Sequence, residues 1–313
     1  MNAQRFAVAM VPYVLSGAAV LLSGGCATEV AEASYDEING DLSSYSNSWV
    51  TLRHDTRKCM APLCGGFWVR DANRKTVERY VSGLVLPATV FDAATAAKVT
   101  SAPPEELVLR GKLSPKEAKF NTQAFLVSGA YRGMPGKAPV AGDAFYSAKP
   151  RSPKISCLAA PCSNEVATKL NFTAPNYFME YAVDRAAAAF VDQEWLAGRV
   201  RNHGAVVAGT IVAGTKYPMG AAPALDASQV YINVKDMAGP CPVFKLAACP
   251  TGTARAYSRS PDLCVLPGEC VAAKACPSKA PAQCAANYAL TAWNPTGGAK
   301  CLAFACDPAF IWE

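Results

Sequence analysis

Cysteine is the residue type that most constrains how this chain folds, because thirteen of its 313 residues are cysteines. A reducing cytoplasm gives no reason to keep so many thiols unless they bind metal or carry out redox work. Zinc sites favour C-x-x-C pairs or cysteines mixed with histidines, but the sequence has no C-x-x-C and only two histidines, His54 and His203. Disulfides formed in an oxidising compartment fit better, and we predict neither a metal site nor a cofactor.

The N-terminus points to the same compartment. Arg5 precedes an apolar stretch over residues 6–22, and small residues follow, which is the pattern of a secretory signal peptide over residues 1–25. The stretch ends in Ser-Gly-Gly-Cys and resembles a bacterial lipoprotein signal, which implies a lipid on Cys26 and leaves an even number of cysteines for pairing. The alternative is ordinary cleavage slightly downstream, which releases a free protein. Residues 26–48 are interpreted as a tether, and the predicted location is an outer-membrane lipoprotein or a secreted or periplasmic protein.

A cysteine loop of the form C-x4-C occurs twice, at an offset of 98 residues. We interpret the two regions as tandem copies of one domain, over 49–140 and 145–237. In each copy we expect a disulfide between the loop cysteines, because a small domain buries little apolar surface and gains from a crosslinked turn. The residues that the offset aligns are Cys59 with Cys157, Cys64 with Cys162, Asn73 with Asn171, and Gly111 with Gly209.

Each copy is predicted to be an α+β domain dominated by strands. Short helices are expected over 91–99 and 190–200, with Asp92 and Asp192 as the N-caps. Several strands and one helix in such a short domain suggest either a small barrel or a sheet covered by a helix. Alternation of apolar and polar residues and β-rich composition place the strands of the first copy at 49–55, 67–71, 106–113 and 124–131.

The surroundings of the first loop resemble a known signature. The stretch RKCMAPLCGGFWVRDANRKT is similar to an uncharacterised bacterial domain family, found in secreted or lipoprotein-like proteins of myxobacterial type. Its hallmark is R-x-C-x-x-P-x-C-G-G followed by a strand and an asparagine turn. The second copy matches more loosely, because Pro161 lies directly before Cys162. The resemblance supports a fold and a compartment and brings no known activity. The residues that carry it are Arg57, Cys59, Pro62, Cys64, Gly65, Gly66 and Asn73.

The composition changes at residue 241, and we predict a disulfide-rich C-terminal region of two four-cysteine modules, over 241–270 and 276–306. Modules this short rarely fold without crosslinks. Four cysteines permit three connectivities, which the sequence does not distinguish, and the spacings fit zinc poorly. The cysteines are Cys241, Cys249, Cys264, Cys270, Cys276, Cys284, Cys301 and Cys306.

We predict no catalytic residue. His54 lies close to Cys59 in the sequence, and a cysteine and a histidine can form a nucleophile pair. Cys59 has an evident partner in Cys64, however, so we interpret His54 as a surface residue at the end of a strand. The larger aromatic residues are interpreted as core or hairpin packing, and they are Phe67, Trp68, Tyr80, Trp195 and Trp293.

Composition and charge limit the possible functions. The formal net charge of +6 is spread thinly, whereas nucleic-acid binding proteins concentrate basic residues on one face. We expect an exported cell-envelope protein that acts as a non-enzymatic interaction or structural surface. The expected partner is an unknown protein or envelope component, and the expected membrane contact is through a lipid anchor only.

Two alternative functions stay open. A protease-inhibitor-like or ligand-binding module would be favoured by an exposed, disulfide-braced loop protruding from the C-terminal modules. A secreted hydrolase with acidic catalytic residues would be favoured by a close-set Asp/Glu pair in a cleft.

Overall fold

The computed structural model describes residues 47–149, 165–178, 180–217, 220–237, 241–298 and 300–312. Strands dominate these residues, with two α-helices among them. Neither helix in this part of the chain is long and apolar enough to cross a membrane. The predicted signal peptide, the lipid on Cys26, most of the tether and the disulfide between Cys157 and Cys162 lie outside the described residues.

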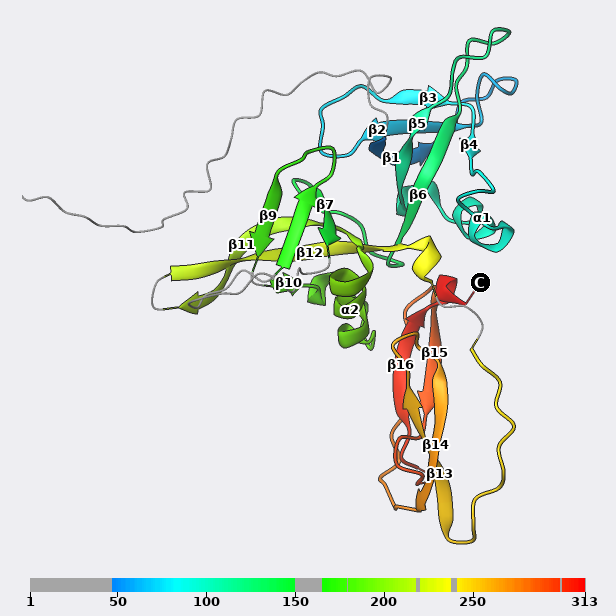
Figure 1. Ribbon diagram of the computed structural model, residues 1–313, viewed down its shortest axis with the longest axis vertical. Coiled ribbons are helices and arrows are strands. Elements are labelled where there is room, and N and C mark those ends of the chain that lie inside the picture. The colour runs from blue at the N-terminus through cyan, green and yellow to red at the C-terminus, as the bar shows by residue number, and fades with distance from the viewer. Residues whose placement is uncertain are drawn as a thin grey trace, which may run out of the picture. The chain divides into compact units, whose positions relative to one another are not determined.

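The elements follow one another in two similar series and a pair of hairpins (Figure 1). The helices are α1 (Ala93–Thr100) and α2 (Gln193–His203). The strands are β1 (Ser48–His54), β2 (Phe67–Asp71), β3 (Arg79–Val81), β4 (Leu84–Val85), β5 (Leu107–Leu113), β6 (Phe125–Gly133), β7 (Ala144–Lys149), β8 (Glu165–Lys169), β9 (Pro175–Phe178), β10 (Glu180–Ala182), β11 (Val206–Tyr217), β12 (Gly220–Asn233), β13 (Thr253–Arg259), β14 (Val265–Ala272), β15 (Tyr288–Trp293) and β16 (Ala303–Pro308).

The first twelve strands form one sheet whose order is nearly a palindrome. It runs β3-β2-β1-β5-β6-β12-β11-β7-β8-β9, with β4 pairing β6 and β10 pairing β12, both in parallel. Each strand of the first half, residues 48–133, therefore has a counterpart six labels later in the second half, residues 144–233. The halves meet where β6 and β12 pair antiparallel, with Arg132 opposite Ile232.

The predicted alternative of a small barrel is not found, since no closed barrel occurs among the described residues. The physical reason lies at the strand edges. An unpaired edge strand leaves a row of backbone donors and acceptors without partners. β6 finds partners for only its first residues in β4 of its own half, and its last residues pair with β12 of the second half. The two ranges predicted as tandem domains thus share one open sheet.

The predicted strands of the first half are confirmed, and their alternation sets the core. Along β1, Ser48, Val50 and Leu52 are buried while Trp49 and Thr51 between them are partly exposed, as expected for a strand with one face on a core. Gly111 in β5 stands at a bulge, where a Cβ atom would lie 2.2 Å from the carbonyl oxygen of Leu126. Gly209 in β11 occupies the same kind of bulge against Asp226, also at 2.2 Å. Both glycines are needed for this close approach of backbones.

Both helices begin where the sequence predicts. The Asp92 carboxylate accepts a hydrogen bond from the Thr95 backbone N–H at 2.7 Å, and the Asp192 carboxylate accepts one from the Trp195 N–H at 2.9 Å. Each aspartate therefore satisfies a backbone donor that the first helical turn leaves open. The buried side of α2 includes Leu196, which belongs to the main apolar core.

Asn73 joins the first half of the sheet to the second. It follows β2 in a left-handed conformation, with φ of 61°, which asparagine tolerates better than most residues. Its Oδ1 accepts a hydrogen bond from the Phe145 N–H at 2.7 Å. Its Nδ2 donates to the carbonyl oxygens of Phe145 at 2.7 Å and Leu170 at 3.1 Å.

Asn171 makes the reciprocal contacts from the second half. Its φ is 64°, and its Oδ1 accepts from the Trp49 N–H at 2.8 Å. Its Nδ2 donates to the carbonyl oxygens of Trp49 at 2.8 Å and Ala72 at 2.9 Å. The two amides, which we call the asparagine clasp, therefore satisfy backbone groups of the opposite half of the sheet.

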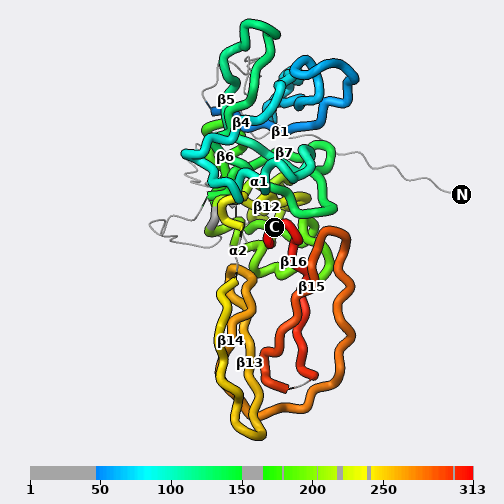
Figure 2. The backbone as a smooth tube through the Cα atoms, turned by 90° about the vertical axis from the view of Figure 1, so that its right-hand side faces the viewer, coloured from blue at the N-terminus to red at the C-terminus, as the bar shows by residue number. Residues whose placement is uncertain are grey.

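The C-terminal region consists of two hairpins, β13–β14 and β15–β16, which lie side by side (Figure 2). The Tyr257 N–H donates to the Asn294 carbonyl oxygen at 2.7 Å and links one hairpin to the other. The Tyr288 hydroxyl donates to the Pro135 carbonyl oxygen at 3.1 Å, which ties the second hairpin to the sheet domain. The residues of this region that belong to the main apolar core are Leu263, Tyr288, Cys306, Phe310 and Ile311.

Candidate functional site

The loop between β1 and β2 is the most constrained surface feature of the sheet. It covers residues 55–66, and a disulfide joins Cys59 to Cys64 with their Cα atoms 5.7 Å apart. The base of the loop is closed by a backbone hydrogen bond from the Asp55 N–H to the Gly66 carbonyl oxygen at 3.0 Å. A second one, from the Leu63 N–H to the Met60 carbonyl oxygen at 3.0 Å, turns the chain at the tip.

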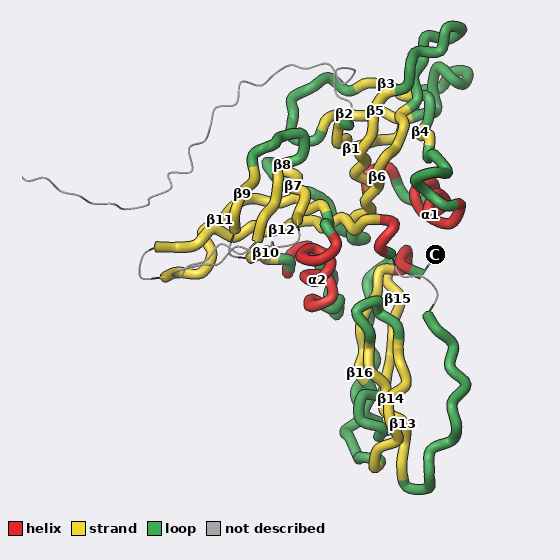
Figure 3. The backbone as a smooth tube through the Cα atoms, in the orientation of Figure 1, coloured by secondary structure: helices red, strands yellow, loops and turns green. Residues whose placement is uncertain are grey.

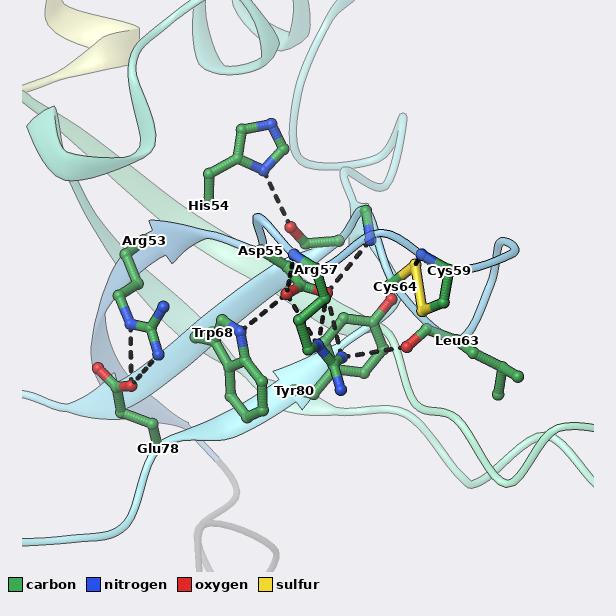
Figure 4. A network of polar contacts seen from close by, with 12 residues as sticks. Arg53, His54, Asp55, Arg57, Cys59, Leu63, Cys64, Trp68, Glu78 and Tyr80 are labelled. Atoms are coloured by element: carbon green, nitrogen blue, oxygen red, sulfur yellow. Dashed lines mark hydrogen bonds and ion pairs between the residues drawn. A yellow bond between two sulfur atoms is a disulfide. The ribbon is translucent and has the colours of Figure 1, made fainter.

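A buried carboxylate organises the base of this loop (Figure 4). Asp55 is only 5% exposed, and it accepts hydrogen bonds from Arg57 Nε at 2.9 Å, Trp68 Nε1 at 3.1 Å and the Gly65 N–H at 3.2 Å. The hydrogen bonds from the Arg57 side chain hold the pKa of Asp55 well below its usual range. Asp55 is therefore ionised at neutral pH and accepts hydrogen bonds from donors on both sides of the loop.

Arg57 carries this anchoring to the tip of the loop. Its guanidinium lies between two rings, 4.8 Å from the centroid of Trp68 and 4.7 Å from that of Tyr80, and it donates to the Leu63 carbonyl oxygen at 3.1 Å. The Tyr80 hydroxyl donates to the Pro62 carbonyl oxygen at 2.8 Å. Two consecutive carbonyls of the loop are thus fixed, one by Arg57 of the loop itself and one by Tyr80 of β3.

The tip that is held so firmly presents apolar side chains to solvent. Met60 is 82% exposed and Leu63 is 48% exposed, and the neighbouring Lys58 is also exposed. Single exposed apolar residues are ordinary on protein surfaces. Here two exposed apolar residues lie on one crosslinked and hydrogen-bonded loop. The ordering of this loop does not bury their side chains, so it calls for another explanation.

The structure gives His54 a structural environment. Its Nδ1 lies 3.1 Å from the Gly66 carbonyl oxygen, and its ring stacks on that of Phe67 with centroids 5.5 Å apart. The sulfur of Cys59 is bonded to that of Cys64, so it is no nucleophile in this state. The arrangement suits the positioning of a loop and not cysteine–histidine catalysis.

Comparison with known protein families matches residues 48–237 to a single family, described as Domain of unknown function (DUF6748). The chain belongs to this family. The match covers both halves of the sheet, including the loop and the asparagine clasp. Neither the curated proteins nor the solved structures contain a match to this chain.

Beyond the DUF6748 match lie the cysteines whose pairing the sequence leaves open. In the first module Cys241 pairs with Cys264 and Cys249 with Cys270. In the second module Cys276 pairs with Cys301 and Cys284 with Cys306. Both modules therefore join first to third and second to fourth cysteine, and the crosslinks tie the segment before each hairpin to the region of its second strand. No group of three or more potential metal ligands occurs among the residues that the structure describes.

Trp68 and Tyr80 make the predicted hairpin packing, because they lie opposite each other on β2 and β3 with ring centroids 5.8 Å apart. Sequence reasoning missed their second role, as half-buried walls for Arg57. The signal that identifies them is the combination of Asp55, Arg57 and Trp68 around a cysteine loop, because a buried carboxylate near Arg and an indole N–H requires these donors.

A recess lined by Trp195, Arg199 and their neighbours has no room for a water-sized sphere.

Proposed function

We propose that this protein is an exported binding protein of the cell envelope, and that the Cys59–Cys64 loop is its recognition element for a partner protein. One observation carries the proposal: the loop exposes Met60 and Leu63 while Arg57 and Tyr80 fix the carbonyls directly beside them. A loop that is ordered before binding loses less conformational entropy on association.

The chemistry of the tip defines the partner surface that suits it. Burying one such side chain contributes about 1.5–3 kcal/mol, so an apolar pocket that takes both Met60 and Leu63 would supply the centre of a small interface. Lys58 lies beside the tip and is exposed. An acidic rim around the partner's pocket would complement it and raise the rate of encounter.

The cysteine pattern supports the compartment. Five disulfides among the described residues favour an oxidising environment outside the cytoplasm. The proposal includes the signal peptide over residues 1–25, the lipid on Cys26, the tether over residues 26–48, and a location as an outer-membrane lipoprotein or a secreted or periplasmic protein. The bacterial, myxobacterial-type origin belongs to the proposal as well, and rests on the loop signature.

The proposal also includes a duplication, with 49–140 and 145–237 as copies of one unit. The matching strand order of the two halves supports it, as do the equivalent bulges at Gly111 and Gly209 and the reciprocal contacts of the asparagine clasp. The Cys157–Cys162 loop is then the counterpart of the recognition loop.

Site-specific photocrosslinking tests the recognition role. A photoreactive phenylalanine analogue at position 60 of the exported protein is expected to give one crosslinked species of defined mass in intact cells. The matched control is position 77, because Val77 is 85% exposed and lies in the β2–β3 connection, away from the disulfide loop. Asp55→Asn should weaken the crosslink at position 60 without changing the level of protein. Equal crosslinking from both positions, or none from position 60, would refute the proposal.

A further inference from the structure

The segment between the first two cysteines of the C-terminal region stands out from the rest of the protein. Residues 242–248 have neither helical nor strand structure (Figure 3), and their apolar side chains face solvent. Val243 is 97% exposed, Phe244 46% and Leu246 44%. Because these apolar side chains are not buried in the core, packing does not explain why they occur together here.

Both ends of this segment are covalently fixed to the same hairpin. Cys241 is bonded to Cys264 at the start of β14, and Cys249 is bonded to Cys270 within β14, with Cα separations of 5.4 and 5.6 Å. Crosslinks at both ends restrict the conformations that are open to the chain between them. Its disulfides act as braces on either side of the exposed residues.

The backbone of the segment is open to a partner. None of its peptide groups makes a backbone–backbone hydrogen bond to another described residue. One side chain supports it: Arg255 of β13 donates to the Ala247 carbonyl oxygen at 2.8 Å and, with its other terminal nitrogen, to the Gly268 carbonyl oxygen at 2.8 Å. Free N–H and C=O groups on a fixed segment are what a partner needs to add its own strand.

The side chains narrow the class of partner. Lys245 stands between Phe244 and Leu246 and is exposed, and no acidic residue occurs in the sequence from 241 to 261. Proteinases with a carboxylate at the base of their primary specificity pocket accept lysine or arginine there. They bind the flanking residues as an extended strand.

We propose that residues 242–248 form a substrate-like inhibitory segment that enters the cleft of a serine proteinase of trypsin-like specificity, with Lys245 in the specificity pocket. This site is separate from the Cys59–Cys64 loop and does not depend on its role. The fixed segment loses little freedom on binding, which favours a tight complex.

The braces also explain why such a segment would inhibit rather than be consumed. Attack of the proteinase serine oxygen on the Lys245 carbonyl carbon forms an ester and breaks the bond to the Leu246 nitrogen, which takes up the serine proton. The new amine stays in place, because the Cys249–Cys270 disulfide and the Arg255 contact to Ala247 hold its side of the chain. The reverse reaction reforms the peptide bond and frees the serine. The complex with the proteinase therefore persists, and the segment is not released as a cleaved product.

The second module offers a matched control within the same protein. Residues 277–283 lie between Cys276 and Cys284, which are paired in the same first-to-third and second-to-fourth pattern. This segment also contains a lysine, Lys279, but its neighbours are Ser278 and Ala280 in place of large apolar residues.

The test is inhibition of bovine trypsin by the full-length, oxidised protein, measured with a small chromogenic arginine substrate. We expect stoichiometric inhibition that Lys245→Ala weakens by roughly 30-fold or more, the loss typical of removing a central interface side chain. Lys279→Ala should leave it unchanged. Lys245→Phe should transfer inhibition from trypsin to chymotrypsin, a result that misfolding does not produce.

Reduction supplies a second readout. With the disulfides reduced, the protein should stop inhibiting trypsin, and mass spectrometry should find rapid cleavage after Lys245. Three outcomes would overturn the proposal: no inhibition by the oxidised protein at 100-fold excess over trypsin, equally rapid cleavage after Lys245 in the oxidised and reduced protein, or inhibition that depends on Lys279 and not on Lys245.

Discussion

Removing one amide of the asparagine clasp tests how the two halves of the sheet are held together. Asn73→Gly deletes three hydrogen bonds to the second half but keeps a residue suited to the left-handed backbone. At about 0.5–1.5 kcal/mol for each of the three hydrogen bonds, we expect the free energy of unfolding to fall by roughly 1.5–4.5 kcal/mol. Asn73→Ala should cost about 1 kcal/mol more, because alanine is strained at a φ of 61°.

The assay is equilibrium unfolding in guanidinium chloride without reductant, followed by tryptophan fluorescence, since Trp49 takes part in the clasp. Asn121 is the matched control, because its φ is 54° and its side chain is exposed. Asn121→Gly is the control for Asn73→Gly. Asn121→Ala is the control for Asn73→Ala, because it introduces the backbone strain without the loss of the clasp. If Asn73→Gly changes stability by no more than Asn121→Gly does, the clasp does not hold the halves together and the reasoning is refuted.

Three further predictions use the same unfolding assay. Because the pKa of Asp55 is lowered in the folded protein, the unfolded chain takes up the proton first as the pH falls. The stability from this carboxylate is therefore present above the unfolded-state pKa of about 4 and is lost progressively below it. Asp55→Asn should flatten this pH dependence. Replacing Cys241 and Cys264 by serine should cost about 2–4 kcal/mol, and partial reduction with peptide mapping should recover that pair. Gly111→Ala should destabilise the protein strongly, because the new Cβ atom would lie 2.2 Å from the carbonyl oxygen of Leu126. Gly198→Ala in α2 has open space around it and should stabilise the protein by up to about 1 kcal/mol. Equal effects of the two substitutions would contradict this prediction.

Local patterns were enough to predict the longer strands and the helix of the first half, but not β3 and β4, which are only three and two residues long. The alternation along β1 and the N-cap aspartates of both helices act over a few residues, so they are legible in the sequence. Asn73 and Gly111 were also identified, as a turn and a strand position. Their chemical task was not, because the partners of Asn73 lie 72 and 97 residues away, and no periodicity encodes a contact between such distant segments.

The candidate site was predictable only in its cysteines. The spacing of Cys59 and Cys64 predicts a crosslinked loop, whereas nothing in the local sequence distinguishes Asp55 from other charged residues near strand ends. Its burial follows from the sheet, which brings Trp68 of β2 and Arg57 together around the carboxylate. The pairing of the C-terminal cysteines was likewise open, since it depends on where the irregular segment before each hairpin lies along the hairpin's second strand.

In the C-terminal region, some parts are held in place by apolar packing and others by disulfides. A two-stranded hairpin is marginal by itself in water, and here only one end of the region has apolar side chains in the main core, including Tyr288, Phe310 and Ile311. The exposed residues 242–248 have no such support, and their position depends on the two disulfides that flank them. An oxidising compartment is therefore a condition for the geometry of this segment, whereas the core of the sheet, built from apolar side chains such as Val50 and Leu225, does not require it. Reduction should accordingly release the exposed segment while leaving the sheet folded.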